Sequence, residues 1–174
     1  GDRRLCCSAP SADPEGWVVV VLLGGPGGGC SPAMRRDFDP RYYRSILFDQ
    51  RGCGRSRPHA SVENNTTWHL VADSELIRET LEIDEWFVFG GSWGATLALI
   101  DAQGHPEAVK GLSLRGVFLA TQSELDWFYG GGAGKFWPET WARFADLIPD
   151  EEQDDYIAAY HKRLFGPDLQ VQTK

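Results

Sequence analysis

The stretch that most constrains this chain is Trp86–Pro106, which reads WFVFGGSWGATLALIDAQGHP. Its first four residues, Trp86–Phe89, are aromatic or β-branched and predict a buried strand, whereas the small residues of Gly94–Gln103 predict a helix that ends at Gly104. A pentapeptide of the form G-x-S-x-G lies between the two. In such a turn a serine on a strained corner projects its hydroxyl above the edge of a sheet, so Ser92 is a candidate nucleophile.

The pentapeptide alone is equally compatible with an ordinary glycine- and serine-rich turn. A second glycine-rich loop, Gly24–Gly29, follows an apolar run over Trp17–Leu23 that predicts another buried strand. This loop lacks the Lys-Ser or Lys-Thr pair of a phosphate-binding loop, which favours an oxyanion hole built from its backbone amides. A flexible connector remains the alternative.

The other elements continue an alternation of strands and helices. Tyr43–Phe48 and Gly111–Arg115 predict two further strands, and Trp68–Leu81 predicts an amphipathic helix. Ser31 followed by Pro32 predicts the start of a short helix. The alternation predicts an α/β fold whose mostly parallel sheet is flanked by helices on both sides.

The loop after Phe48 reads DQRGCGRS and brings three arginines together by Arg57. These cations are suited to binding a substrate carboxylate. The alternative is that the loop is held together by its own Asp–Arg pairing, as in many surface loops.

The character of the sequence changes after Val117. Aromatic residues gather in three groups and acidic residues in a fourth, without a strand pattern. We expect helices that start a cap over the sheet, with aromatic side chains walling a small apolar pocket. An ordinary helical layer with an aromatic core and a solvated acidic face is the alternative.

Composition limits the function classes. The 174 residues are enough for one domain but few for a large α/β enzyme. A net charge of −8 disfavours nucleic acid and anionic membranes as partners. Residues 1–16 lack the apolar core of a signal peptide, so we expect a cytoplasmic protein. The cysteines lack metal-ligand spacing, so we expect free thiols and no metal at Cys6, Cys7, Cys30 and Cys53.

Five motifs occur in one order: GGPGGG, DQRGCGRS, NNTTWHLVAD, VFGGSWGATLAL and LRGVF, the last followed by WFY. From about Val18 to about Leu164 the chain closely resembles the prolyl iminopeptidase (prolyl aminopeptidase) family of α/β-hydrolases. The resemblance implies a serine peptidase that removes N-terminal proline from small peptides without metal or cofactor. Ser92 then matches the family's nucleophile, and the backbone amides of Trp93 and Gly25 match its oxyanion hole.

The resemblance also implies a domain organisation. Residues 1–16 are expected to form an irregular lead-in, residues 17–117 the N-terminal part of an α/β-hydrolase domain, and residues 118–174 the start of the helical cap. The family's catalytic Asp and His lie downstream of the cap, so we expect the 174 residues alone to be an incomplete and nearly inactive chain. Leu23 also departs from the family, which usually has histidine there.

Two other functions remain compatible with these motifs. A carboxylesterase or amidase uses the same turn and oxyanion loop, because the fold does not determine the substrate. A non-catalytic protein with this fold would use the pocket for binding alone.

Overall fold

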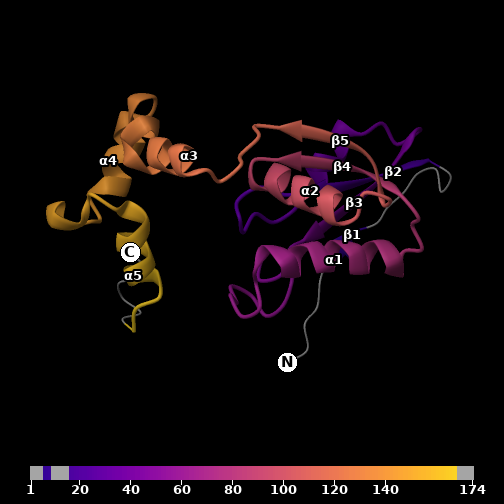
Figure 1. Ribbon diagram of the computed structural model, residues 1–174, viewed down its shortest axis with the longest axis horizontal. Coiled ribbons are helices and arrows are strands. Elements are labelled where there is room, and N and C mark those ends of the chain that lie inside the picture. Colours follow the sequence, from indigo (N-terminus) through magenta and orange to yellow (C-terminus); the bar gives the residue numbers. More distant parts are fainter. Residues whose placement is uncertain (1–5, 9–15, 168–174) are drawn as a thin grey trace. The chain divides into compact units, whose positions relative to one another are not determined.

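The computed structural model describes residues 6–8 and 16–167, and the chain divides into two compact units (Figure 1). Unit 1 spans Gly1–Leu119 and unit 2 spans Ala120–Lys174. Unit 1 contains the sheet, in which the strand order is β1-β3-β2-β4-β5. The strands are β1 (Cys6–Ser8), β2 (Trp17–Leu22), β3 (Tyr43–Asp49), β4 (Trp86–Gly91) and β5 (Val109–Arg115).

The strands β3, β2, β4 and β5 are parallel, as the sequence predicts. The centre of the sheet is defined by Val20, which lies opposite Ile46 on one side and Val88 on the other. The prediction that residues 1–16 are irregular is wrong at Cys6–Ser8, which pairs antiparallel with the end of β3. Three residues are too few to show a strand period in the sequence, and this edge strand forms by pairing with β3.

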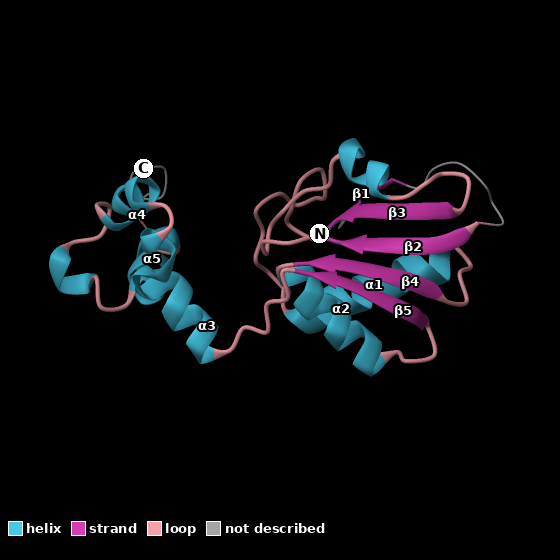
Figure 2. Cartoon of the chain, turned by 90° about the horizontal axis from the view of Figure 1, so that it is seen from above, coloured by secondary structure: helices cyan, strands magenta, loops and turns pink. Residues whose placement is uncertain are grey.

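Two helices cover one face of the sheet, where α1 (Thr67–Thr80) and α2 (Trp93–Gly104) lie side by side (Figure 2). Their apolar side chains join the main core with Val20 and Leu22 of β2. Alternate residues of the same strand face the other side, where Val21 joins a smaller cluster. That cluster packs against side chains from the 3₁₀ helix η1 (Pro32–Asp37) and its flanks. Helical cover is therefore present on both faces, as predicted, but it is uneven.

The predicted boundaries agree with the observed ones to within two residues. β4 continues from Phe89 to Gly91 because its glycines stay in register with β5, up to the pair Gly91 and Arg115. The short helix after Ser31 is present as η1. Helix α1 begins with a capping box, in which the side chains of Thr66 and His69 satisfy backbone groups reciprocally.

Every regular element in the described residues of unit 2 is helical. Its α-helices are α3 (Gln122–Trp127), α4 (Pro138–Ala145) and α5 (Tyr156–Leu164). Shorter helical turns connect them, namely η2 (Phe128–Gly132), η3 (Ala133–Lys135) and η4 (Asp150–Glu152). The prediction of helices without intervening strands is confirmed for residues 120–167.

Candidate active site

Ser92 lies at the corner between β4 and α2. Its backbone has φ 56° and ψ −123°, a conformation that L-residues rarely adopt. The flanking glycines make the corner possible, since a Cβ on Gly90 would lie 2.4 Å from the carbonyl oxygen of Gly94, and one on Gly94 would lie 2.0 Å from that of Leu22. The predicted strained turn at the end of the strand is confirmed, and close backbone contact explains both glycines.

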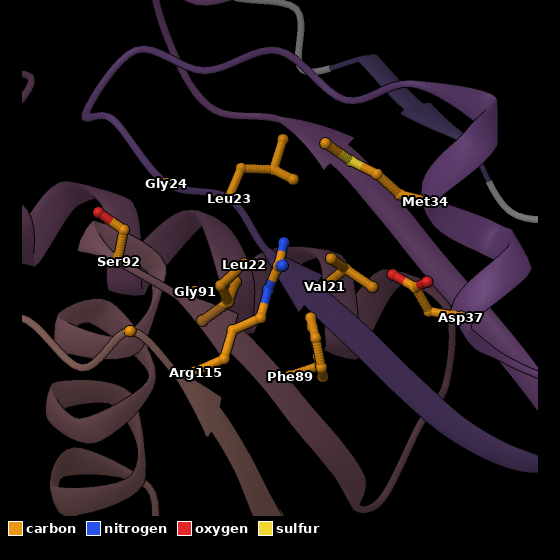
Figure 3. Close-up of a pocket in the computed structure, with 11 residues that line it drawn as sticks. Val21, Leu22, Leu23, Gly24, Met34, Asp37, Phe89, Gly91, Ser92 and Arg115 are labelled. Atoms are coloured by element: carbon orange, nitrogen blue, oxygen red, sulfur yellow. The ribbon is translucent and has the colours of Figure 1, made fainter. Parts of the chain in front are cut away.

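A cavity of about 350 Å³ opens beside Ser92 at the carboxyl ends of the strands. Figure 3 shows Ser92 next to Gly24, the first residue of the glycine-rich loop. A Cβ placed on Gly24 would lie 3.8 Å from the hydroxyl oxygen of Ser92. The prediction that the serine faces this loop is therefore confirmed. The lining residues are Val21, Leu22, Leu23, Gly24, Met34, Asp37, Phe89, Gly91, Ser92, Arg115 and Gly116.

The two residues predicted to form the oxyanion hole flank this lining without belonging to it. Gly25 follows Gly24, and its φ of 128° together with its close approach to Gly27 requires a glycine there. Trp93 is the first residue of α2, so its backbone N–H has no acceptor within the helix. Both amides therefore belong to backbone turns that border Ser92.

Two charged side chains in the cavity were missed by the sequence analysis. The guanidinium of Arg115 lies 5.8 Å from the centre of the Phe89 ring, and Asp37 comes from η1 (Figure 3). Within residues 16–167, Arg115 forms no ion pair with a carboxylate. A signal for Arg115 existed, because it ends a parallel strand and so lies at the same sheet edge as Ser92. Asp37 had no such signal.

The loop after β3 is held by its own Asp–Arg pairing, which confirms the alternative given for this segment. Arg55 Nε lies 2.8 Å from Asp49 Oδ2, and Arg51 pairs with Asp73 of α1 instead, at 2.6 Å. Burial of Asp49 disfavours its charged form, but hydrogen bonds from Cys30 and Arg55 outweigh burial and hold the pKa of Asp49 below its usual range.

Cys30 and Cys53 are free thiols, as predicted, and both are partly buried. Burial is the largest cause that raises the pKa of each thiol, so neither is an activated nucleophile. The side chains of Cys6 and Cys7 lie outside the described part of the structure.

No histidine of unit 1 is among the residues that line this cavity in the described structure. His69 contacts Thr66 within the capping box, with its Nδ1 2.8 Å from the threonine hydroxyl. His105 follows the end of α2, and its Nδ1 lies 3.7 Å from Oε2 of Glu75 in α1. No histidine base for Ser92 is therefore present among the described residues that line the cavity.

Unit 2 has a cavity of its own, with a volume of about 270 Å³. Its walls are almost entirely apolar, in agreement with the small aromatic pocket that the sequence predicts. The lining residues are Phe128, Tyr129, Ala133, Trp137, Thr140, Trp141 and Phe144.

A parallel sheet with a serine on a strained strand-to-helix turn defines the class of this protein. Residues 18–169 match the model of the alpha/beta hydrolase fold, and the chain belongs to that family. Among the described residues, no helix has both the length and the apolar character needed to cross a membrane.

Relatives of high sequence similarity are named proline iminopeptidases. The protein from Arabidopsis thaliana is 57% identical over 163 residues, which cover 93% of this chain and 43% of the relative. The protein from Xylella fastidiosa strain Temecula1 is 55% identical, and the match covers 90% of this chain and 50% of the relative. The solved structure of a proline iminopeptidase-related protein from Thermus thermophilus is 26% identical, with a TM-score of 0.62. The match covers 98% of this chain and 59% of that protein. The chain thus spans about half the length of the curated relatives it matches.

Proposed function

We propose that this protein is a prolyl aminopeptidase-like serine hydrolase that releases N-terminal proline from small peptides. The observation that carries the proposal is the strained turn at Ser92 beside the glycine-rich loop, in a chain 50–57% identical to proteins named proline iminopeptidase. The same turn and loop serve acyl transfer in general, so the likeness to these relatives supports the choice of substrate.

In the proposed mechanism, Ser92 Oγ attacks the prolyl carbonyl and forms an acyl-enzyme as the rest of the peptide leaves. The backbone amides of Trp93 and Gly25 donate hydrogen bonds to the oxyanion of the tetrahedral intermediate. Such donors stabilise charge that develops only in the transition state, which makes them worth more in rate than in substrate binding. Water then hydrolyses the acyl-enzyme and regenerates Ser92. The proposal requires no metal or cofactor.

A serine hydroxyl needs a base to accept its proton, and no histidine lines the cavity in the described structure. We therefore expect the 174-residue polypeptide alone to hydrolyse prolyl substrates at a rate near background. Loss of the base in a serine protease costs about six orders of magnitude in turnover.

The proposal also covers the role of unit 2, the class of partner and the cellular location. We assign residues 118–174 to the start of a helical cap, which contains the aromatic cavity. The net charge of −8 agrees with small peptides, rather than nucleic acid or anionic membranes, as partners. We place the activity in the cytoplasm.

The test uses the protein as its gene encodes it, assayed on a prolyl arylamide and on a short acyl ester. We expect arylamide hydrolysis that falls by at least about 10⁴-fold in Ser92→Ala, together with labelling of Ser92 by a fluorophosphonate. Hydrolysis of the ester alone would instead indicate a carboxylesterase. A folded protein that neither hydrolyses nor becomes labelled would indicate a binding function.

A further inference from the structure

Two adjacent residues at the end of β3 hold both ends of the glycine-rich loop. The side-chain amide of Gln50 donates a hydrogen bond to the carbonyl oxygen of Leu23, 3.3 Å away, just before the loop. Asp49 Oδ1 accepts a hydrogen bond from the backbone N–H of Cys30, 2.6 Å away, just after it. Asp49 and Gln50 are 1% and 2% exposed, so the bond of Gln50 is buried and that of Asp49 is partly shielded from water.

The Asp49 carboxylate is also the point where two loops meet. Its Oδ2 accepts hydrogen bonds from the backbone N–H and the Nε of Arg55, at 3.1 and 2.8 Å. A Cβ on Gly54 would lie 2.6 Å from Asp49 Cγ, and one on Gly29 would lie 3.3 Å from the Cα of Gly54. The glycines thus let the two backbones close around one buried carboxylate.

The glycine-rich loop has little of its own to fix its shape. Its residues, apart from Pro26, lack side chains, and glycine has the largest backbone freedom to lose on folding. Inside the loop, the backbone bond from Gly28 N–H to the Gly24 carbonyl is 3.2 Å long. The position of the Gly25 amide therefore depends on what anchors the two ends of the loop.

We infer that Asp49 and Gln50 are positioning residues, which set the distance between the oxyanion-hole amide of Gly25 and Ser92 without touching the substrate. This inference rests on the proposed function, because it assumes that the Gly25 amide acts on a developing oxyanion. Oxyanion donors must lie about 2.7–3.1 Å from that oxygen, and a displacement of about 1 Å can cost about 100-fold in rate. The anchors therefore contribute to turnover more than to substrate binding.

The kinetic test compares Asp49→Asn with Asp73→Asn in the protein as its gene encodes it. Both carboxylates are buried and paired with an arginine, but Asp73 pairs with Arg51 and forms no hydrogen bond or ion pair with the glycine-rich loop among the described residues. We expect Asp49→Asn to lower kcat on a prolyl arylamide at least tenfold with KM changed less than threefold. Asp73→Asn should lower the melting temperature and leave kcat within twofold. Equal losses of kcat in the two variants, at equal folded fractions, would overturn the inference.

The second test needs no activity and uses Gln50→Met, which keeps the length of the side chain and removes its donor. Amide hydrogen exchange at Gly24–Cys30 should become at least tenfold faster in this variant, while exchange in α1 stays unchanged. Unchanged exchange in the loop would contradict the inference even if the wild-type protein hydrolyses prolyl substrates. Faster exchange in the loop of Gln50→Met, together with a wild-type protein that does not hydrolyse prolyl substrates, would support the anchors and contradict the proposed function.

Discussion

The two units of the molecule are stabilised internally by different kinds of contact. In unit 1 a parallel sheet and two helices bury a continuous core of aliphatic and aromatic side chains around Val20, Trp86 and Leu97. In the described part of unit 2, only Gly132, Ile148 and Ala159 are buried. Unit 1 is thus fixed by close packing, which permits the sub-ångström placement that the proposed catalytic turn needs.

Unit 2 relies on contacts between aromatic rings. Phe144 is central, stacked on Tyr160 with ring centres 4.6 Å apart and tilted against Trp141 and Tyr156 at 5.2 and 5.3 Å. Several rings of this unit remain largely exposed, Phe136 and Trp137 among them. Such a cluster provides apolar surface with adaptable geometry, suited to walls of a pocket rather than to reacting groups. The comparison shows that the proposed nucleophile lies in the closely packed unit, whereas unit 2 provides adaptable apolar surface.

The largest expected effect tests the close packing in unit 1. Substitution Gly94→Ala would place a Cβ 2.0 Å from the carbonyl oxygen of Leu22, which neither backbone can relieve without moving β2 or α2. We expect a loss of more than about 3 kcal/mol in the free energy of unfolding of unit 1. The matched control is Gly104→Ala in the same helix, where a Cβ meets nothing within 4 Å and stability should rise by up to about 1 kcal/mol. Urea unfolding followed by circular dichroism measures both, and equal stabilities would contradict the prediction.

The next effect concerns pH and a buried acid of unit 1. Asp101 is fully buried, and neither of its oxygens has a hydrogen-bond partner among the described residues. Burial, with the charge of Glu75, raises the pKa of Asp101 from 3.8 to about 6, partly opposed by His105 and Arg78. A raised pKa means that the folded state keeps a proton that the unfolded state loses, so stability is full below pH 3.8 and falls as the pH rises toward 6.

One pKa unit corresponds to about 1.4 kcal/mol, so this loss amounts to at most about 3 kcal/mol for Asp101. Asp101→Asn should remove that part of the pH dependence and stabilise unit 1 at pH 7. Thermal unfolding between pH 4 and 7 provides the measurement. In unit 2, hydrogen bonds from Arg163 and Lys162 lower the pKa of Glu152. The stability that Glu152 contributes is therefore lost as the pH falls, which is opposite to the effect of Asp101. A variant with the same pH profile as wild type would show that folding does not raise the pKa of Asp101.

The smallest expected effect tests the aromatic cluster of unit 2. Phe144→Ala removes ring contacts with four neighbours, but the side chain is only half-buried. We expect a loss of about 1–2 kcal/mol confined to unit 2, below the cost of deleting a fully buried ring. Phe165→Ala, which removes an exposed ring that contacts His161, is the control and should change stability by less than about 0.5 kcal/mol. Hydrogen exchange in α4 and α5 separates this unit from the sheet, and a destabilised sheet would disprove the confinement.

The sequence by itself determined the sheet and the turn that carries Ser92. Continuous apolar runs such as Trp17–Leu23 specify buried parallel strands, because helices on both faces exclude water. Glycines at Gly90 and Gly94 specify the sharp corner, because no other residue lets strand and helix approach so closely. Strand burial and the sharp corner depend on residues that are near one another in the chain, so residue type and spacing reveal them.

Only the tertiary structure decided which distant groups meet. Asp49 bonds to Cys30, nineteen positions earlier, while Arg51 turns away to Asp73 on α1. Arg115 and Asp37 enter the cavity of Ser92 from separate elements, and Asp101 is buried without a partner among the described residues. β1 forms only by pairing with β3. Each of these contacts depends on strand register and helix packing between segments far apart in the chain. Apart from the place of Arg115 at the end of a parallel strand, charge and spacing along the sequence carry no record of that geometry.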